Sequence, residues 1–210
     1  MSLFITFEGG DGSGKTYQSK ALYRKLCQQG IASMITQEPG GTPLGDKIRN
    51  ILKLYNQSAI SPESELFLFN ACRVHLINEV IKPGLQKGSV VICDRFADST
   101  TVYQGYGRGI DLKTVKAVNQ IALQGIRPDL TVLLDIPVEI GLSRKNNNLN
   151  DRFETQGFSF HDRIRNGFLQ LAFEEPERWL VVDGLMSKKD IFDTIWNRVK
   201  YLLQINNNTN

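Results

Sequence analysis

The chain has 210 residues, 41% of them hydrophobic, which is enough to bury a sizeable core. Its net charge is +3, with 25 basic and 22 acidic residues spread along the sequence. This mild excess suits small anionic ligands and argues against an electrostatic nucleic-acid surface. Apolar stretches are too short to span a membrane, so we expect a protein that binds neither membrane nor nucleic acid.

The three cysteines, Cys27, Cys72 and Cys93, lie far apart, and their spacings are not those of metal ligands. Each falls within an apolar segment, so we expect buried thiols in a reducing compartment. The first residues lack the basic start of a signal peptide. Both observations favour a cytoplasmic protein.

Apolar runs alternate with helix-like stretches along the chain. The apolar runs are Leu3–Phe7, Ala32–Thr36, Ser89–Cys93, Leu130–Leu134 and Trp179–Val182. The helix-like stretches are about 14–29, 43–54, 62–81, 111–124, 158–174 and 187–204. Because the apolar runs are continuous, they are typical of strands buried on both faces of a parallel sheet. We expect one domain over residues 1–210, an α/β fold with a five-stranded parallel sheet flanked by helices.

Two helix starts have a clear capping pattern. Thr42 and Ser61 each stand directly before a proline, an N-cap followed by a first helical residue that needs no N–H donor.

A complete phosphate-binding loop follows the first apolar run. Its residues are Gly9, Gly10, Asp11, Gly12, Ser13, Gly14, Lys15 and Thr16, which match the spacing G-x-x-x-x-G-K-[ST]. The glycines allow the backbone to wrap the phosphates, Lys15 supplies a charge for the β- and γ-phosphates, and Thr16 offers a hydroxyl to Mg²⁺. The pattern predicts a P-loop NTPase fold that binds a nucleoside triphosphate.

Three apolar runs are followed directly by an aspartate, namely Asp94, Asp135 and Asp183. An aspartate at a strand end can hold Mg²⁺ in P-loop enzymes. Asp135 stands before a helix start, which favours a capping role, and Asp183 before a glycine, which favours a turn. Asp94 is followed by Arg95, so we expect Asp94 at the metal and Arg95 at a phosphate.

The absence of one motif and the small size of the chain argue against two classes of P-loop protein, GTPases and motors. The guanine-binding string Asn-Lys-x-Asp of GTPases does not occur, and 210 residues with one phosphate loop are small for a motor. Transfer between small molecules is favoured, as in a nucleotide or metabolite kinase.

Several motifs, in order, resemble those of bacterial thymidylate kinases between Ile5 and about Leu171. They are Phe7–Thr16, Glu38–Thr42, Phe69–Arg73, Asp94–Phe96 and Ser99–Gly109. The resemblance implies transfer of the γ-phosphate of ATP to dTMP with Mg²⁺, giving dTDP for dTTP biosynthesis. It also implies a homodimer.

The resemblance further implies roles for particular residues. Asp11 would accept a hydrogen bond from the 3′-hydroxyl of the acceptor, and Lys15 and Arg95 would stabilise the transferred phosphoryl group. The residues expected around the acceptor are Glu38, Arg49, Phe69, Arg73, Arg95, Ser99, Thr100, Tyr103 and Gln104. Among these, Phe69 would stack on thymine and Arg73 would donate to its O4, with Thr100 and Gln104 completing the base edge. Tyr103 would exclude a ribose 2′-hydroxyl. Phe69 as plain core and Arg49 as a solvated helix residue stay open as alternatives.

The chain departs from the family pattern at the phosphate loop, where Gly12 stands in a position that some members fill with arginine. Gln37 likewise stands where relatives often have arginine. We expect the missing charge to come from a short mobile lid over about residues 143–155, with Arg152 as first choice for the transition state and Arg144 as second. Because this lid holds few arginines, a nucleotide-binding regulatory protein without efficient transfer remains an alternative.

Overall fold

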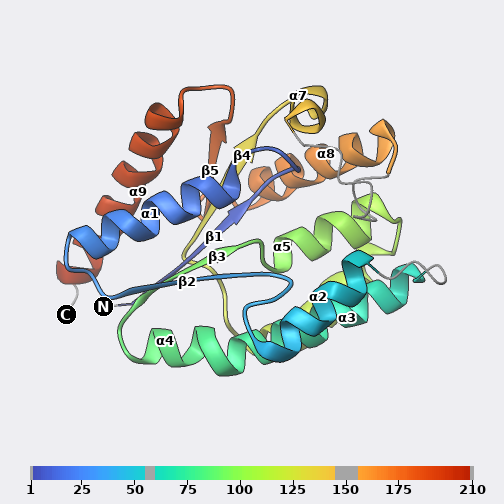
Figure 1. The fold of residues 1–210 in the computed structure, drawn as a ribbon, viewed down its shortest axis with the longest axis horizontal. Coiled ribbons are helices and arrows are strands. Elements are labelled where there is room, and N and C mark those ends of the chain that lie inside the picture. The colour runs from blue at the N-terminus through green and yellow to red at the C-terminus, as the bar shows by residue number, and fades with distance from the viewer. Residues whose placement is uncertain (1, 55–59, 145–155, 209–210) are drawn as a thin grey trace.

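Five parallel strands form one sheet in the computed structural model, which describes residues 2–54, 60–144 and 156–208. The strands are β1 (Leu3–Glu8), β2 (Ser33–Gln37), β3 (Val90–Asp94), β4 (Leu130–Asp135) and β5 (Trp179–Asp183). Their order across the sheet is β2-β3-β1-β4-β5, and each neighbouring pair is parallel (Figure 1). The predicted sheet is therefore confirmed, with each strand end within one residue of its expected place.

Helices cover both faces of this sheet (Figure 1). The described α-helices are α1 (Lys15–Gln28), α2 (Pro43–Leu54), α3 (Pro62–Leu76), α4 (Lys82–Gln86), α5 (Ala97–Thr100), α6 (Leu112–Leu123), α7 (Val138–Ser143), α8 (Phe158–Glu174) and α9 (Lys188–Asn208). Two π-helical stretches, η1 (Ile77–Ile81) and η2 (Thr101–Gly107), extend α3 and α5. Helices α1 and α9 pack together on one face, whereas η1, α4 and α8 lie on the other.

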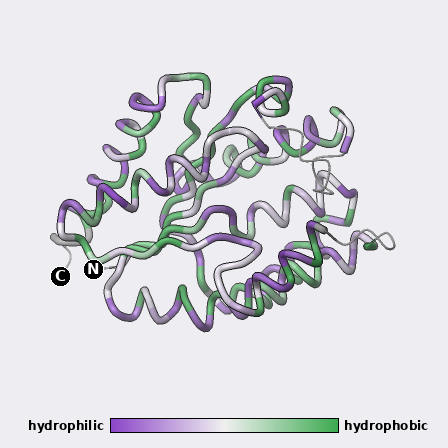
Figure 2. Tube along the Cα trace, in the orientation of Figure 1, coloured by the Kyte–Doolittle hydropathy of each residue, from purple (hydrophilic) through white to green (hydrophobic). Residues whose placement is uncertain are grey.

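Successive residues of β1 enter different halves of the core. Leu3, Ile5 and Phe7 pack with α1 and α9, and Phe4 packs with η1 and β3 on the opposite face. Because both faces are covered, the strand is apolar at successive positions rather than at alternate ones. Figure 2 shows the same concentration of apolar residues on the central strands.

The two predicted caps are present. Thr42 Oγ1 accepts from the N–H of Gly45 at 3.0 Å, and Ser61 Oγ accepts from the N–H of Ser64 at 3.2 Å. Each bond satisfies a backbone donor that the helix itself leaves without a partner.

The helical segment α5–η2 was not predicted. It contains Gly105 and Gly107, and glycine disfavours helix locally. A Cβ on Gly105 would lie 2.5 Å from the Leu112 side chain, and one on Gly107 would lie 2.8 Å from Phe160. Close packing between elements, rather than local propensity, therefore explains these glycines.

The prediction of three buried thiols was wrong for Cys27. Cys72 and Cys93 are buried, but Cys27 is exposed on α1 because it follows Leu26, the residue that faces the core. In the part of the chain that the structure describes, none of the helices has the length and apolarity to cross a membrane.

Candidate active site

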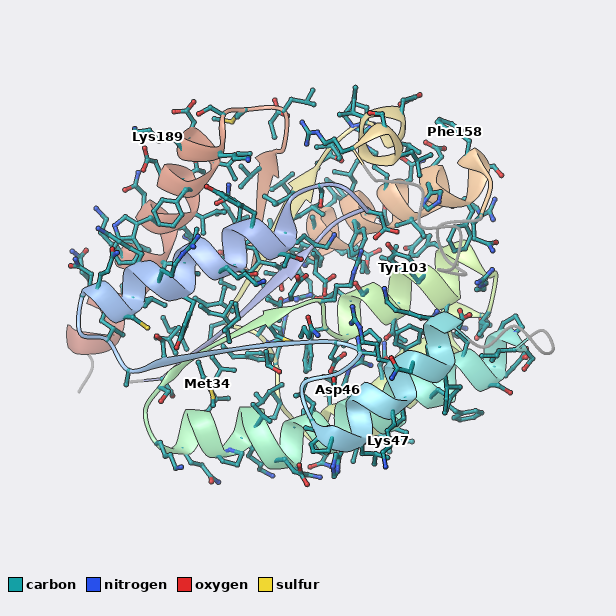
Figure 3. All side chains as sticks on the ribbon, in the orientation of Figure 1. Met34, Asp46, Lys47, Tyr103, Phe158 and Lys189 are labelled. Carbon is teal, nitrogen blue, oxygen red and sulfur yellow. The ribbon has the colours of Figure 1, made fainter. Side chains whose placement is uncertain are left out.

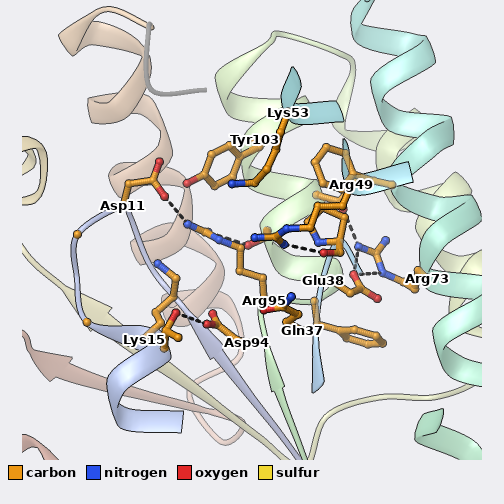
Figure 4. Close-up of a pocket in the computed structure, with 18 of the residues that line it drawn as sticks. Asp11, Lys15, Gln37, Glu38, Arg49, Lys53, Arg73, Asp94, Arg95 and Tyr103 are labelled. Atoms are coloured by element: carbon orange, nitrogen blue, oxygen red, sulfur yellow. Dashed lines mark hydrogen bonds and ion pairs between the residues drawn. The ribbon is translucent and has the colours of Figure 1, made fainter. Parts of the chain in front are cut away.

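The phosphate loop joins β1 to α1 at the carboxyl edge of the sheet (Figure 4). Lys15 folds back over it and donates from Nζ to the carbonyl oxygens of Gly9 and Gly10 at 2.9 and 2.7 Å, and to Ser13 Oγ at 3.3 Å. Burial, together with repulsion from Arg95, lowers the pKa of Lys15 to about 7. A triphosphate on the loop would supply the negative charge that favours the protonated amine.

Gly12 is in close contact with helix α7. Its φ is +71°, and a Cβ at this position would overlap the carbonyl oxygen of Gly141. In return, a Cβ on Gly141 would lie 2.5 Å from the carbonyl oxygen of Asp11. The backbone therefore leaves no room for a side chain at Gly12, which gives a physical reason for the missing loop arginine.

Thr16 and Asp94 meet beside the loop, as predicted for a metal site. Thr16 lies in the first turn of α1, and Asp94 ends β3 in register with Phe7 of β1. Thr16 Oγ1 donates to Asp94 Oδ2 at 2.5 Å. No cluster of three or more His, Cys, Asp or Glu suited to a metal occurs among the described residues. Two oxygen groups suit Mg²⁺, which takes few protein ligands and completes its shell with water and phosphate.

Arg95 reaches from the end of β3 to the phosphate loop. Its φ is +68°, an uncommon region for a residue with a side chain. Nη2 donates to Asp11 Oδ1 at 2.7 Å, and Nη1 donates to the Gly9 carbonyl at 3.1 Å and to Ser99 Oγ at 3.2 Å. The guanidinium also lies 5.1 Å from the centre of the Tyr103 ring. Arg95, which we expected at a phosphate, therefore contacts Asp11, the loop acid that we expected at the acceptor.

Glu8 belongs to the site, and sequence reasoning missed it. It ends β1 and is fully buried. Its Oε1 accepts from the N–H of Phe96 at 2.7 Å, and its Oε2 accepts from the Ser99 hydroxyl at 2.6 Å. Burial, with repulsion from Asp98, raises the pKa of Glu8 to about 8. Glu8 therefore holds in place the turn that carries Arg95. An acidic residue directly after a buried apolar run is the feature of the sequence that could have pointed to it.

Arg73 and Glu38 form a buried ion pair on the far side of the site (Figure 4). Arg73 Nε and Nη2 donate to Glu38 Oε2 at 3.0 and 2.7 Å. Arg73 also donates to Asn70 Oδ1 at 3.0 Å, Asn119 Oδ1 at 2.9 Å and Thr100 Oγ1 at 2.7 Å. All five N–H groups of the guanidinium are engaged. Asn70 and Asn119 were not predicted, because their role depends on how α3 and α6 pack.

These groups surround a cleft of about 410 Å³. The predicted residues that line it are Asp11, Gly12, Gly14, Lys15, Thr16, Glu38, Arg49, Phe69, Arg73, Asp94, Arg95, Ser99, Thr100, Tyr103, Gln104 and Arg144. Further lining residues are Tyr17, Gln37, Pro39, Lys53 and Phe96. Lys53 stands four residues after Arg49 in α2, a spacing that could have revealed it. Arg152 lies outside the described residues.

Aromatic side chains line part of the cleft. Phe69 is half-buried, lines the cleft and also packs against the core, so it is a partial core residue, and its stacking on the base stays a prediction. Tyr103 is buried, and its ring meets those of Phe160 and Phe168 edge-on at 6.2 and 6.4 Å. Burial raises the pKa of Tyr103, so the hydroxyl stays neutral. Figure 3 shows this residue in the interior, whereas Phe158 lies on the periphery.

Two further arginines line the cleft. Arg49 donates from Nη1 to the carbonyl oxygen of Pro39 at 2.6 Å, so it is not simply a solvated helix residue. Arg144 follows α7 and donates from Nη1 to the carbonyl oxygen of Gly184 at 3.4 Å. Both can bring positive charge to an anionic ligand.

The other two strand-end aspartates have structural partners. The capping role expected for Asp135 was wrong, because its two oxygens accept from Arg165 Nε and Nη2 at 2.7 and 2.9 Å. Asp183 forms the predicted turn, accepting from the N–H of Leu185 at 2.9 Å. Of the three candidates, Asp94 is the one that meets Thr16.

Comparisons with known proteins show which family this chain resembles along most of its length. A family model described as thymidylate kinase matches residues 7–195. A thymidylate kinase of Dehalococcoides mccartyi is 53% identical over 207 residues, covering 99% of this chain and all of the relative. One from Geobacter sulfurreducens is 48% identical over 191 residues, 88% of this chain and 90% of the relative. The crystal structure of thymidylate kinase from Ehrlichia chaffeensis has a TM-score of 0.76 at 34% identity, covering 94% of this chain and 98% of that one.

Proposed function

This chain belongs to the thymidylate kinase family, and from that premise we propose how its cleft works. The protein phosphorylates dTMP to dTDP with the γ-phosphate of ATP. ATP would lie on the phosphate loop and dTMP between Arg95 and Arg73. One observation carries this assignment: the 2.7 Å contact of Arg95 with Asp11 brings the donor loop and the acceptor wall together in one cleft.

Transfer in this cleft needs positioning and neutralisation of charge more than proton transfer. The acceptor phosphate is already anionic, so a general base is not required. Lys15 would bind the β- and γ-phosphates and Arg95 the oxygens between donor and acceptor. Asp11 would accept from the 3′-hydroxyl, while its ion pair keeps Arg95 in place. Glu38 and Arg49 would flank the acceptor phosphate.

Thr16 and Asp94 would hold Mg²⁺. The proposal is supported by two oxygen ligands in contact at the base of the phosphate loop. When bound, the ion neutralises charge on the phosphate oxygens.

The thymine base would stack on Phe69, with Thr100 and Gln104 at its polar edge. Because every N–H of Arg73 already has a protein acceptor, a bond from Arg73 to O4 must share or replace one of these contacts. Thr100 Oγ1 accepts from Arg73, so its own proton can be donated to a base carbonyl. Tyr103 would exclude a 2′-hydroxyl by its bulk.

Residues 1–210 would form a single domain with a lid over about residues 143–155. This lid would supply the positive charge that the phosphate loop lacks at Gly12. Arg152 is our first choice and Arg144 our second. The need for a cation from outside the phosphate loop is supported by Gly12, whose backbone leaves no room for an arginine in the loop.

We propose a cytoplasmic homodimer. Its three thiols are free, in keeping with a reducing compartment. Helices α3 and α6 pack together, and each carries an apolar stripe that is exposed or half-buried. The residues of these stripes are Phe67, Ala71 and Val74 on α3 and Ala117, Val118 and Ile121 on α6. Such a surface suits a second copy of the chain. Sedimentation will test the mass.

A coupled assay of ADP release tests the function. With ATP and Mg²⁺ we expect release to depend on the acceptor, with dTMP preferred over dUMP, UMP, CMP and AMP. The wild type is compared with Asp11→Asn, which keeps the shape of the side chain but weakens its hydrogen bond with Arg95. Absence of acceptor-dependent release would refute the transfer, and a preference for UMP or AMP would refute the specificity.

A further inference from the structure

We propose that Glu65, which lies behind the cleft wall, selects the base by fixing the amide orientation of Gln104. In this arrangement Gln104 presents its oxygen to the base and accepts only from a ring N–H at N3. The inference rests on the proposed placement of dTMP, and makes Glu65 a positioning residue for specificity.

Gln104 has a defined contact on one side and an open acceptor on the other. Its side chain is fully buried, and it lines the cleft. Nε2 donates to Glu65 Oε1 at 2.8 Å. Within the described residues, Oε1 of Gln104 has no hydrogen-bond partner. A buried acceptor without a partner costs free energy, which a donor on the ligand would recover.

Glu65 decides which end of this amide faces the cleft. Its carboxylate is fully buried and paired with Arg108, whose Nε and Nη2 lie 3.2 and 3.3 Å from its two oxygens. A carboxylate held by a guanidinium accepts and does not donate. Gln104 must therefore turn Nε2 toward Glu65 and Oε1 toward the cleft.

The resulting edge discriminates between pyrimidines. Thymine and uracil carry a donor at N3 and an acceptor at C4, whereas cytosine has an acceptor at N3 and an amino group at C4. Cytosine would set its N3 lone pair against Gln104 Oε1 and leave that oxygen without a partner. Thr100, whose Oγ1 accepts from Arg73 and keeps its own proton, adds a donor on the C4 side, which again suits a carbonyl.

The test compares dTMP with 5-methyl-dCMP, which share the methyl group and differ at N3 and C4. The wild type should prefer dTMP in kcat/KM by roughly a hundredfold or more. In Glu65→Gln the substituted amide can donate to Gln104 and reverse it, so we expect this preference to fall by roughly tenfold or more. If the role of Glu65 were purely structural, Glu65→Gln would lower kcat/KM for both substrates alike and leave their ratio unchanged.

Gln104→Met is the second variant, because it removes the acceptor without touching the Glu65–Arg108 pair. It should lower the same ratio, and Glu65→Gln added to it should bring no further change. An unchanged ratio in Gln104→Met would overturn the inference even if Glu65→Gln failed to fold. A lowered ratio in Gln104→Met with a full ratio in Glu65→Gln would also overturn it. Failure of the wild type to phosphorylate dTMP would instead refute the proposed function.

Discussion

Replacing Gly12 by alanine should destabilise the protein more than the same change elsewhere in the phosphate loop. Three loop glycines form a graded series. Gly10 is not left-handed in φ and has open space around a built Cβ. Gly14 has a φ of +95° but open space, whereas Gly12 combines a φ of +71° with overlap of the Gly141 carbonyl oxygen. Comparing alanine variants at these three positions therefore separates the free-energy cost of backbone strain from that of steric overlap.

The expected magnitudes follow from these two terms. A left-handed conformation costs an alanine about 1 kcal/mol, so Gly14→Ala should lose that amount. Overpacking adds about 1–3 kcal/mol, so Gly12→Ala should lose about 3 kcal/mol in all. Gly10→Ala should be neutral or gain about 0.5 kcal/mol, because alanine restricts the unfolded chain.

Urea unfolding without nucleotide measures these differences, since a ligand could mask them. For a chain of this length, a loss of about 3 kcal/mol corresponds to a fall in Tm of about 6–12 °C. Gly141→Ala offers a check from the other side, because its Cβ would meet the Asp11 carbonyl at 2.5 Å without unusual backbone angles. Equal losses in Gly12→Ala and Gly14→Ala would refute the argument that contact with α7 excludes a side chain.

Three further predictions concern charge. Because the pKa of Glu8 is raised to about 8, its contribution to the free energy of unfolding is present below about pH 4.5 and is lost as pH rises through 8. Relative to Glu8→Gln, the wild type should lose a few kcal/mol of unfolding free energy over that range. A constant difference between the two proteins from pH 5 to 9 would contradict this. Asp94→Asn should raise the Mg²⁺ concentration for half-maximal activity by roughly tenfold or more, and an unaltered Mg²⁺ titration would reject its metal role. Arg152→Ala should lower kcat by roughly a hundredfold with little change in ATP affinity, more than Arg144→Ala does; equal losses of rate and affinity would exclude a transition-state contact.

Features whose geometry is decided within a few residues were predictable. The phosphate loop, the cap at Ser61 and the turn at Asp183 all depend on backbone angles and short-range hydrogen bonds. The strands were also predictable, because burial on both faces requires continuous apolar runs. The position of Asp94 beside Thr16 followed from that sheet, since carboxyl ends of parallel strands share one edge.

Partners of buried charges were not predictable in the same way. Asp135 was expected to cap a helix but binds Arg165, and Glu38 and Arg73 were assigned to different parts of the substrate but bind each other. Glu8 was overlooked, although it holds the turn of Arg95. Residue spacing carries no information about which distant charge will lie nearby, because that depends on how whole elements pack.

Binding of a nucleoside triphosphate at the strand ends of a parallel sheet could be predicted from residue order alone, because the loop residues and the hydrophobic pattern act locally. The hydrogen bonds that hold the cleft together depend on the folded structure: Glu8 bonds to the turn of Arg95, Arg95 to Asp11, and Gln104 to Glu65. Each of these contacts joins residues from different elements. A buried polar group needs a partner wherever folding brings one, and that place is set by packing and not by position in the chain.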